Sequence, residues 1–214
     1  MIKGDMAMRY YSQIGQDQFL NESIFQGKEN GFFVDIGAHN GITFSNSYFF
    51  ERHKNWQGLC IEPMPNIYKL LRENRRCICI EGAISFENGV QEFLSLAGHT
   101  EMYSCLLTGS DPRHLERIQR EMQRHGGNQQ VIQVKTYTLQ SILDDHHVKS
   151  IDFCSIDTEG NELTVLQSVD WEKVDIKCLV VENSYQDRAI RDYLETKKYK
   201  LIERLEWDDI YLRE

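Results

Sequence analysis

The sequence lacks a long apolar run. No stretch approaches the roughly 18 apolar residues that cross a bilayer, although 41% of its 214 residues are hydrophobic. Its opening residues, MIKGDMAMRYYSQ, also lack the apolar segment of a secretory signal. These absences exclude a membrane-spanning chain, so we expect a cytoplasmic protein with no membrane partner.

The sequence has fewer basic than acidic residues. The chain has 24 Lys and Arg against 33 Asp and Glu, which gives a net charge of -9. A nucleic-acid-binding protein normally gathers Lys and Arg on one face. The dense basic stretches 72–76 and 113–124 are short and contain glutamate, so we interpret them as solvated helix faces. We therefore expect no nucleic-acid partner.

The six cysteines never show the CxxC spacing of zinc or redox sites. Most of them lie within apolar segments, as in CICIEGAI at 77–84. Buried thiols in a reducing compartment behave as small hydrophobic side chains. The cysteines therefore predict core packing and neither disulfides nor a zinc site.

Short apolar segments alternate with helical patterns along the chain. Buried parallel strands read as near-continuous apolar runs because helices cover both faces of the sheet. The segments with this character are 31–36, 58–62, 77–83, 151–157 and 177–183. Two last strands, 200–204 and 207–212, are too closely linked to be parallel. The sequence predicts one α/β domain over 1–214, with a mostly parallel sheet, helices on both faces and a C-terminal antiparallel hairpin.

Two segments fall outside this alternation. Residues 1–30 predict an N-terminal helical segment. Residues 97–130 are polar, rich in His, Arg and Gln, and broken by glycines, which we interpret as an inserted helical lid. The lid is flanked by an edge strand at 91–96 and a half-exposed strand at 131–136.

A glycine loop follows the first predicted strand. Glycines let the backbone approach a ligand, and the start of the next helix offers unpaired N–H groups. Asp35 precedes the first glycine of the loop, where its carboxylate would repel the phosphates of a dinucleotide. It suits a ligand that carries ammonium or sulfonium charge, such as S-adenosylmethionine. The candidate cofactor-binding residues here are Asp35, Gly37, Ala38, His39, Asn40 and Gly41.

Glu62 ends the second strand, where an acid can accept hydrogen bonds from both hydroxyls of a ribose. An NAD-dependent oxidoreductase would share this feature, but the chain lacks the GxGxxG phosphate loop of that class. Glu62 therefore favours binding of a nucleoside, but it does not distinguish S-adenosylmethionine from NAD.

Further acids lie at the ends of the later strands: Asp157 and Glu159 at the end of 151–157, and Glu182 with Asn183 at the end of 177–183. Ligands of open α/β sheets lie beyond these strand ends. Asp157, Glu182 and Asn183 resemble the acid and amide ligands of magnesium-dependent O-methyltransferases, so Mg²⁺ is a candidate cofactor. Asp157 could equally hold the cofactor's ammonium group, and Glu182 and Asn183 could cap the next helix.

At this point the sequence resembles the FkbM family of methyltransferases. The matching segments are YSQIGQD from Tyr11, FFVDIGAHNG, CIEPMP, EGAIS, DPRHLERI, IDFCSIDTEGNELTVL and VVEN. The resemblance implies a class I, Rossmann-like methyltransferase fold. It also implies methyl transfer from S-adenosylmethionine, commonly to a hydroxyl of a sugar, glycan or secondary metabolite.

Carried over residue by residue, the resemblance places Glu62 on the ribose hydroxyls and lets Ala83 and Ile84 border the adenine. Gln13 and Gln16 fold over the cofactor, or simply start a helix. A hydroxyl acceptor needs a base or a metal. The candidates for the base are Asp157, Glu159, His99 and His114.

Other functions stay open at this stage. N-methylation is the main rival within the class, although no NPPY-like motif follows the strand at 151–157. A nicotinamide oxidoreductase and a non-catalytic interaction domain are the rivals outside it. The sequence specifies neither the acceptor nor the oligomeric state.

Overall fold

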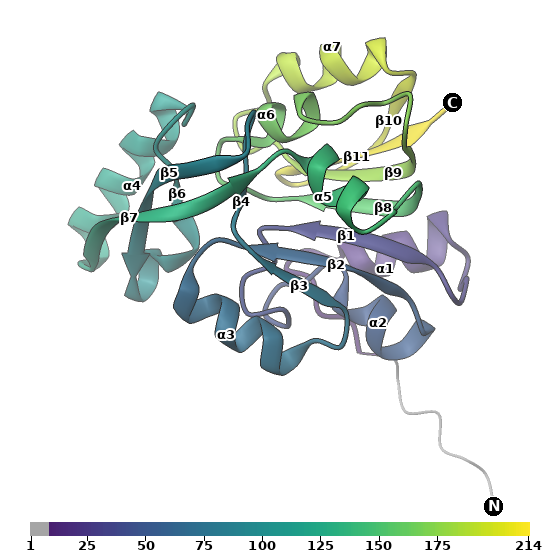
Figure 1. The fold of residues 1–214 in the computed structure, drawn as a ribbon, viewed down its shortest axis with the longest axis horizontal. Helices are drawn as coiled ribbons and strands as arrows, with labels where there is room; N and C mark the ends of the chain where they lie inside the picture. Colours follow the sequence, from purple (N-terminus) through teal and green to yellow (C-terminus); the bar gives the residue numbers. More distant parts are fainter. Residues whose placement is uncertain (1–8) are drawn as a thin grey trace, which may run out of the picture.

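The computed structural model describes residues 9–214, which form a seven-stranded and a four-stranded sheet (Figure 1). Residues 1–8 of the predicted N-terminal segment lie outside the described residues. No helix in the described part is long and apolar enough to cross a membrane.

The larger sheet is mostly parallel and has a single reversed strand among those described. Its order is β10 (Tyr199–Leu205), β11 (Asp208–Arg213), β9 (Asp175–Glu182), β8 (Ser150–Ile156), β1 (Phe32–Ile36), β2 (Gln57–Glu62) and β3 (Ile78–Glu81). Strand β11 runs antiparallel to both of its neighbours. The predicted Rossmann-like sheet with a C-terminal hairpin is confirmed.

Side chains of the central strands alternate between two cores. Val34 and Ile36 belong to the core that also holds side chains of α5 (Leu139–Asp145), α6 (Glu162–Gln167) and α7 (Arg188–Thr196). Phe33 points the other way, as expected from the period of two in a strand. It packs among aromatic side chains under α2 (Tyr48–Lys54), together with side chains of α3 (Pro65–Asn74), α1 (Gln16–Phe19) and the π-helix η1 (Leu20–Ile24).

The smaller sheet was not predicted. Its order is β4 (Ala83–Ile84), β7 (Asn128–Tyr137), β5 (Gly89–Ala97) and β6 (Cys105–Leu106). The connection between β5 and β7 holds a 3₁₀-helix, η2 (Gly98–Tyr103), and the helix α4 (Pro112–His125). The segment predicted as a helical lid therefore contains a long helix, but it belongs to a sheet lying beside the main one (Figure 1).

The strand order reverses at β1. From β1 the chain continues to β2 and β3 on one side, whereas β8 and β9 extend the sheet on the other. Loops leave in opposite directions at such a switch point and open a crevice beyond the carboxyl ends of the strands. The ends of β1, β2, β8 and β9 meet there.

Candidate active site

A cavity of about 440 Å³ lies at this switch point, within the usual size range of small-molecule sites. Residues of both sheets line it. The structure brings the following predicted residues to its wall: Gln13, Gly37, His39, Glu62, Ala83, Ile84, His99, Asp157, Glu159 and Glu182. Their roles remain predictions, but their shared location follows from the fold.

Glu62 is held at the end of β2 by the backbone. Its Oε2 accepts a hydrogen bond from the His39 N–H at 3.0 Å, and its Oε1 accepts one from the Met64 N–H at 2.9 Å. Burial raises the pKa of Glu62 to about 7, despite these two backbone donors. A carboxylate offers about four lone-pair positions, so both oxygens keep capacity for ligand hydroxyls.

The loop glycines are required by protein contacts. Gly37 has φ +81°, and a Cβ there would lie 1.7 Å from the carbonyl oxygen of Asp157. A Cβ on Gly41 would lie 2.6 Å from the side chain of Arg75 and 2.7 Å from that of Leu71. Gly37 still borders the cavity, whereas Gly41 does not. The prediction that Gly41 admits the cofactor is therefore corrected: it admits Arg75.

Asp35 also faces away from the cavity. It lies on the same side of β1 as Phe33, because strand side chains alternate, and accepts hydrogen bonds from Ser45 and Ser47 beneath α2. Burial raises its pKa, while the buried Arg75 nearby acts in the opposite direction. The predicted contact between Asp35 and the cofactor is thus replaced by a structural network.

Three more predicted cofactor residues lie off the cavity wall. Gln16 is buried and donates from its side-chain amide to Asp208. Ala38 is buried, and its N–H bonds the Ile61 carbonyl at 3.0 Å. The side-chain oxygen of Asn40 accepts hydrogen bonds from the following turn, at 2.8 Å from Thr43 N. Each group is already used to shape the loop or the N-terminal segment.

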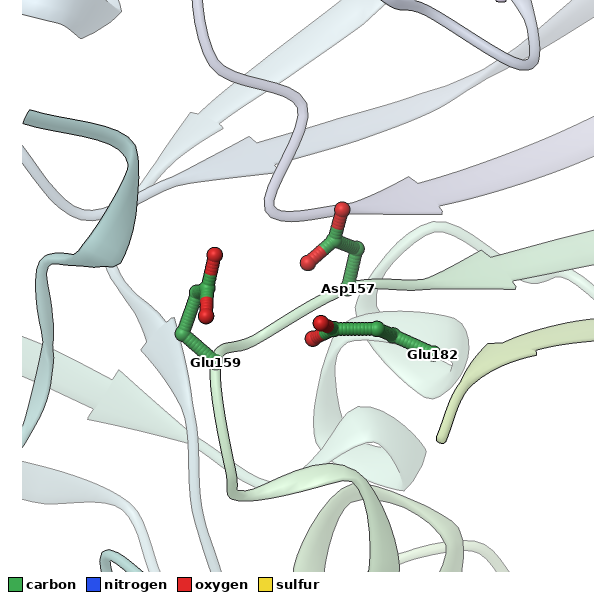
Figure 2. A group of neighbouring side chains, drawn as sticks. All are labelled: Asp157, Glu159 and Glu182. Carbon is green, nitrogen blue, oxygen red and sulfur yellow. The ribbon is translucent and has the colours of Figure 1, made fainter. Parts of the chain in front are cut away.

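Three carboxyl groups lie close together on the cavity wall. Figure 2 shows Asp157 and Glu159, from the loop after β8, turned toward Glu182 at the end of β9. One oxygen from each lies within 4.8 Å of the others. Burial raises the pKa of all three; repulsion from Glu182 adds to the effect at Asp157 and Glu159, and repulsion from Asp208 adds to it at Glu182. The three residues form an acid cluster whose ionised form a bound cation would stabilise.

Asn183 does not join the acid cluster. Its Nδ2 donates to Asp209 at 2.8 Å, and its Oδ1 accepts from the Asp187 N–H at 2.6 Å. Asn183 therefore holds the start of α7 against the hairpin. The predicted metal set of Asp157, Glu182 and Asn183 stays a prediction; the structure gathers Glu159 with Asp157 and Glu182, and the Asn183 side chain is bonded elsewhere.

His114 acts behind the cavity wall. It is 1% exposed, its Nε2 lies 3.0 Å from the Tyr103 carbonyl, and its Nδ1 lies 3.4 Å from Glu159 Oε2. Burial lowers its pKa. It borders a second cavity of about 280 Å³ instead of the main one. The prediction of His114 as a base stays untested, and the structure places His114 beside Glu159 and off the wall of the main cavity.

The two cavities share part of their walls. The residues common to both are Arg117, Glu159, Asn161, Glu182 and Ser184. Sequence reasoning missed Arg117, which stacks over the Tyr103 ring at 4.3 Å and reaches Glu159 at 3.7 Å. It also missed Glu101, which meets His39 at 3.1 Å. Both lie in the segment interpreted as a lid, where nothing in the sequence pattern distinguished them from solvated charges.

Comparison with known proteins identifies the family. The family model "Methyltransferase FkbM domain" matches residues 35–201. "Methyltransferase sdnD" from Sordaria araneosa is 26% identical over 225 residues, which cover 91% of this chain and 85% of that protein.

Solved structures show the same fold. The methyltransferase FkbM from Methylobacillus flagellatus KT aligns with a TM-score of 0.54 and 13% identity, over 94% of this chain and 48% of that one. This chain thus spans about half the length of that protein. A methyltransferase from Geobacter sulfurreducens aligns with a TM-score of 0.50 and 13% identity, over 95% of this chain and 80% of that one. With most of the sequence matched by the family model, the chain belongs to the FkbM methyltransferase family.

Proposed function

We propose that the main cavity binds S-adenosylmethionine and that the protein transfers its methyl group to a hydroxyl oxygen. The observation that carries this proposal is the placement of Glu62 and the acid cluster on the wall of one cavity. Glu62 has two oxygens ready for ribose hydroxyls, and the acid cluster offers negative charge to the ammonium and sulfonium of the cofactor. The phosphates of a dinucleotide would meet mostly negative charge here, where Arg117 lies among the carboxylates.

The acceptor approaches from the wall that the two cavities share. Methyl transfer is an in-line displacement, so the protein has to align the nucleophile, exclude water and remove one proton. Asp157 and Glu159 line the main cavity at this wall. Burial and neighbouring acids raise the pKa of both groups, which makes each a stronger proton acceptor than an ordinary carboxylate. His114 positions Glu159 from behind.

The acceptor class follows from the same wall. Carboxylates together with Arg117 and Ser184 offer acceptors and donors to a polyhydroxylated molecule. We therefore propose a sugar, glycan or hydroxylated secondary metabolite as acceptor, with no nucleic acid as partner. The free thiols in the described part of the chain suit the reducing cytoplasm.

Mg²⁺ is a second candidate cofactor, favoured by the geometry of the acid cluster. Asp157, Glu159 and Glu182 provide hard oxygen ligands within 4.8 Å of one another, and Mg²⁺ completes such partial sets with water or substrate oxygens. When bound, the ion would lower the pKa of an acceptor hydroxyl. Full turnover after EDTA treatment would exclude this role, whereas turnover restored by added Mg²⁺ would support it.

The cofactor assignment is tested by calorimetric titration of the purified protein with S-adenosylhomocysteine and, separately, with NAD⁺. We expect saturable binding of the sulfur ligand and none of the dinucleotide. Binding of NAD⁺ without S-adenosylhomocysteine would overturn the proposed function. Transfer of label from [methyl-³H]S-adenosylmethionine to a panel of glycosides and their amino-sugar counterparts then tests oxygen against nitrogen as nucleophile.

A further inference from the structure

We propose that the second cavity is an acceptor subsite in which Glu162 binds a primary ammonium group, so that the acceptor is an amino sugar or a similar aminated polyol. This inference rests on the proposed function, since it names the acceptor of the same site. The second cavity, of about 280 Å³, adjoins the main one along the wall that carries Glu159 and Glu182. A molecule that fills the second cavity can therefore present a hydroxyl group to the main one.

The second cavity carries more negative than positive charge. Five carboxyl groups and two guanidinium groups line it, and both guanidinium groups already have partners. Arg113 is paired with the carboxylates that cap the starts of α4 and α7, and Arg117 lies 3.7 Å from Glu159. No basic side chain in the described part of the chain forms an ion pair with Glu162 or Glu182, although both are buried.

These two unpaired acids differ in which cavity can supply a counter-charge. Glu182 borders both cavities, so the cofactor proposed for the main cavity can balance it. Glu162 borders the second cavity and not the main one. A cation that balances Glu162 would therefore lie in the second cavity.

One oxygen of Glu162 is used by the protein, and the other is available to a ligand. Oε1 accepts hydrogen bonds at 3.0 Å from the Thr158 N–H, the Thr158 hydroxyl and the Gly160 N–H. Oε2 accepts none of the hydrogen bonds among the described residues, yet it is not one of the unpartnered oxygens that are closed off from solvent. The residue as a whole is only 7% exposed. Burial, and then repulsion from Glu182, raises its pKa to about 7, and an ammonium group at Oε2 would stabilise the carboxylate form.

The size and lining of the second cavity favour an organic ammonium over a bare metal ion. Its volume is many times the roughly 30 Å³ that one water molecule occupies. Glu162 is not one of the three carboxyl groups that lie within 4.8 Å of one another, so it does not complete a set of metal ligands. Leu163, Tyr185 and Ile190 add apolar and aromatic surface to the wall, against which a carbon skeleton can pack.

The test measures the binding of matched probes to the protein saturated with S-adenosylhomocysteine. The probes are methyl α-D-glucoside and its amino-deoxy derivatives, in which an amino group replaces each hydroxyl in turn. Dissociation constants are measured by titration calorimetry at pH 7. We expect the wild type to bind at least one amino derivative about tenfold more tightly than the parent glucoside, which corresponds to about 1.4 kcal/mol. Glu162→Gln keeps an oxygen for the three loop hydrogen bonds but loses the charge, and should reduce the preference to within about threefold.

Two further variants separate the charge of Glu162 from its structural role. Thr164→Lys places an ammonium group on the wall of the second cavity without changing Glu162, and should abolish the preference by occupying the subsite. It gives the readout even if Glu162→Gln fails to fold. Glu116→Gln removes an exposed carboxylate of α4 that lies off both cavities, and should keep the wild-type preference.

A wild type that prefers none of the amino derivatives would overturn the inference while leaving the proposed function intact. The same holds for a preference that survives in folded Glu162→Gln or in Thr164→Lys. Failure of the wild type to bind S-adenosylhomocysteine would instead count against the proposed function.

Discussion

The buried carboxyl group of Glu62 lowers the stability of the empty protein but favours ligand binding. Glu62 is 4% exposed, and burial shifts its pKa to about 7. The same burial places its oxygens where a ribose can reach them. A residue that is costly to ionise in the empty protein becomes useful when a ligand supplies hydrogen-bond donors.

Glu62→Ala should weaken S-adenosylhomocysteine binding by about tenfold or more, since a hydrogen bond to a charged group contributes about 1.5 to 3 kcal/mol. Titration calorimetry measures the change. Glu81→Ala is the control, because Glu81 ends the neighbouring strand in register with Glu62 but is exposed and lies off the cavity wall. Equal affinities for wild type and Glu62→Ala would remove Glu62 from the ribose site.

Asp157→Asn should raise the melting temperature of the ligand-free protein at pH 8 and abolish methyl transfer. Asp157 is surrounded by Glu182, Glu159 and other acids that raise its pKa, in addition to its burial. Removing one charge relieves that repulsion, and each kcal/mol gained corresponds to roughly 2 to 4 °C for a chain of this size. Differential scanning fluorimetry gives the comparison. Asp145→Asn, on an exposed part of α5, should leave the melting temperature unchanged, and a lower value for Asp157→Asn would contradict the prediction.

The location of a residue was predictable where its side chain ends a strand. Glu62, Asp157 and Glu182 reached the cavity because parallel strands deliver their carboxyl ends to one edge. Asp35 was misplaced because its position depends on which face of β1 it occupies, and the Phe33 side of β1 is covered by α2 and its serines. Arg117 was missed because its contact with Glu159 joins segments far apart in sequence.

At the scale of elements, β1 and β8 fit together through a backbone contact. Gly37→Ala should destabilise the fold by at least about 3 kcal/mol, since the added Cβ meets the Asp157 carbonyl and the φ of +81° is itself unfavourable. Gly98→Ala shares the strain, with φ +80°, but its Cβ would meet nothing within 4 Å. It should cost about 1 to 2 kcal/mol.

Urea unfolding of both variants separates strain from collision, since the midpoint reports stability when the slope is unchanged. Similar losses for the two variants would mean that the Asp157 segment yields easily. The collision between β1 and the end of β8 would then not be what requires a glycine at position 37.

Helices and strands were easier to predict from the sequence than the pairing of the strands. The main strands and the final hairpin were predicted because buried runs and a two-residue link allow few arrangements. The smaller sheet was not, although strands at 91–96 and 131–136 were predicted. These are parts of β5 and β7, whose pairing spans an intervening helix and is not visible in the sequence pattern. A polar connecting segment does not indicate whether the strands on either side of it pair with each other.

For the whole molecule, the raised carboxyl pKa values predict a pH-dependent stability. The pKa is raised to about 7 for Glu62 and Glu162 and to about 6 for Asp208. The folded state therefore binds more protons than the unfolded state between the ordinary carboxyl range and pH 7, and its stability falls as pH rises through that window. The melting temperature of the ligand-free protein should increase as pH is lowered from 8 to 5.5.

At more acidic pH the melting temperature of the ligand-free protein should fall again. Glu51 and Asp152 have lowered pKa values through Arg75 and through Lys177 with Lys28, even though burial opposes the shift. The stability that these ion pairs provide is lost as pH falls through the lowered pKa values. Melting curves at closely spaced pH values test both limbs. A melting temperature that is flat or falls between pH 8 and 5.5 would contradict the assignment of buried, costly carboxylates.

The position of β1 between β2 and β8 also has a consequence for synthesis on the ribosome. Phe33 pairs with Phe153, about 120 residues later in the chain. At synthesis rates of roughly 5 to 20 residues per second, one edge of β1 waits on the order of 6 to 24 seconds for its partner. During that interval the β1–β2–β3 portion exposes an open strand edge, and a nascent chain of this protein is at its most vulnerable to pairing with a neighbour.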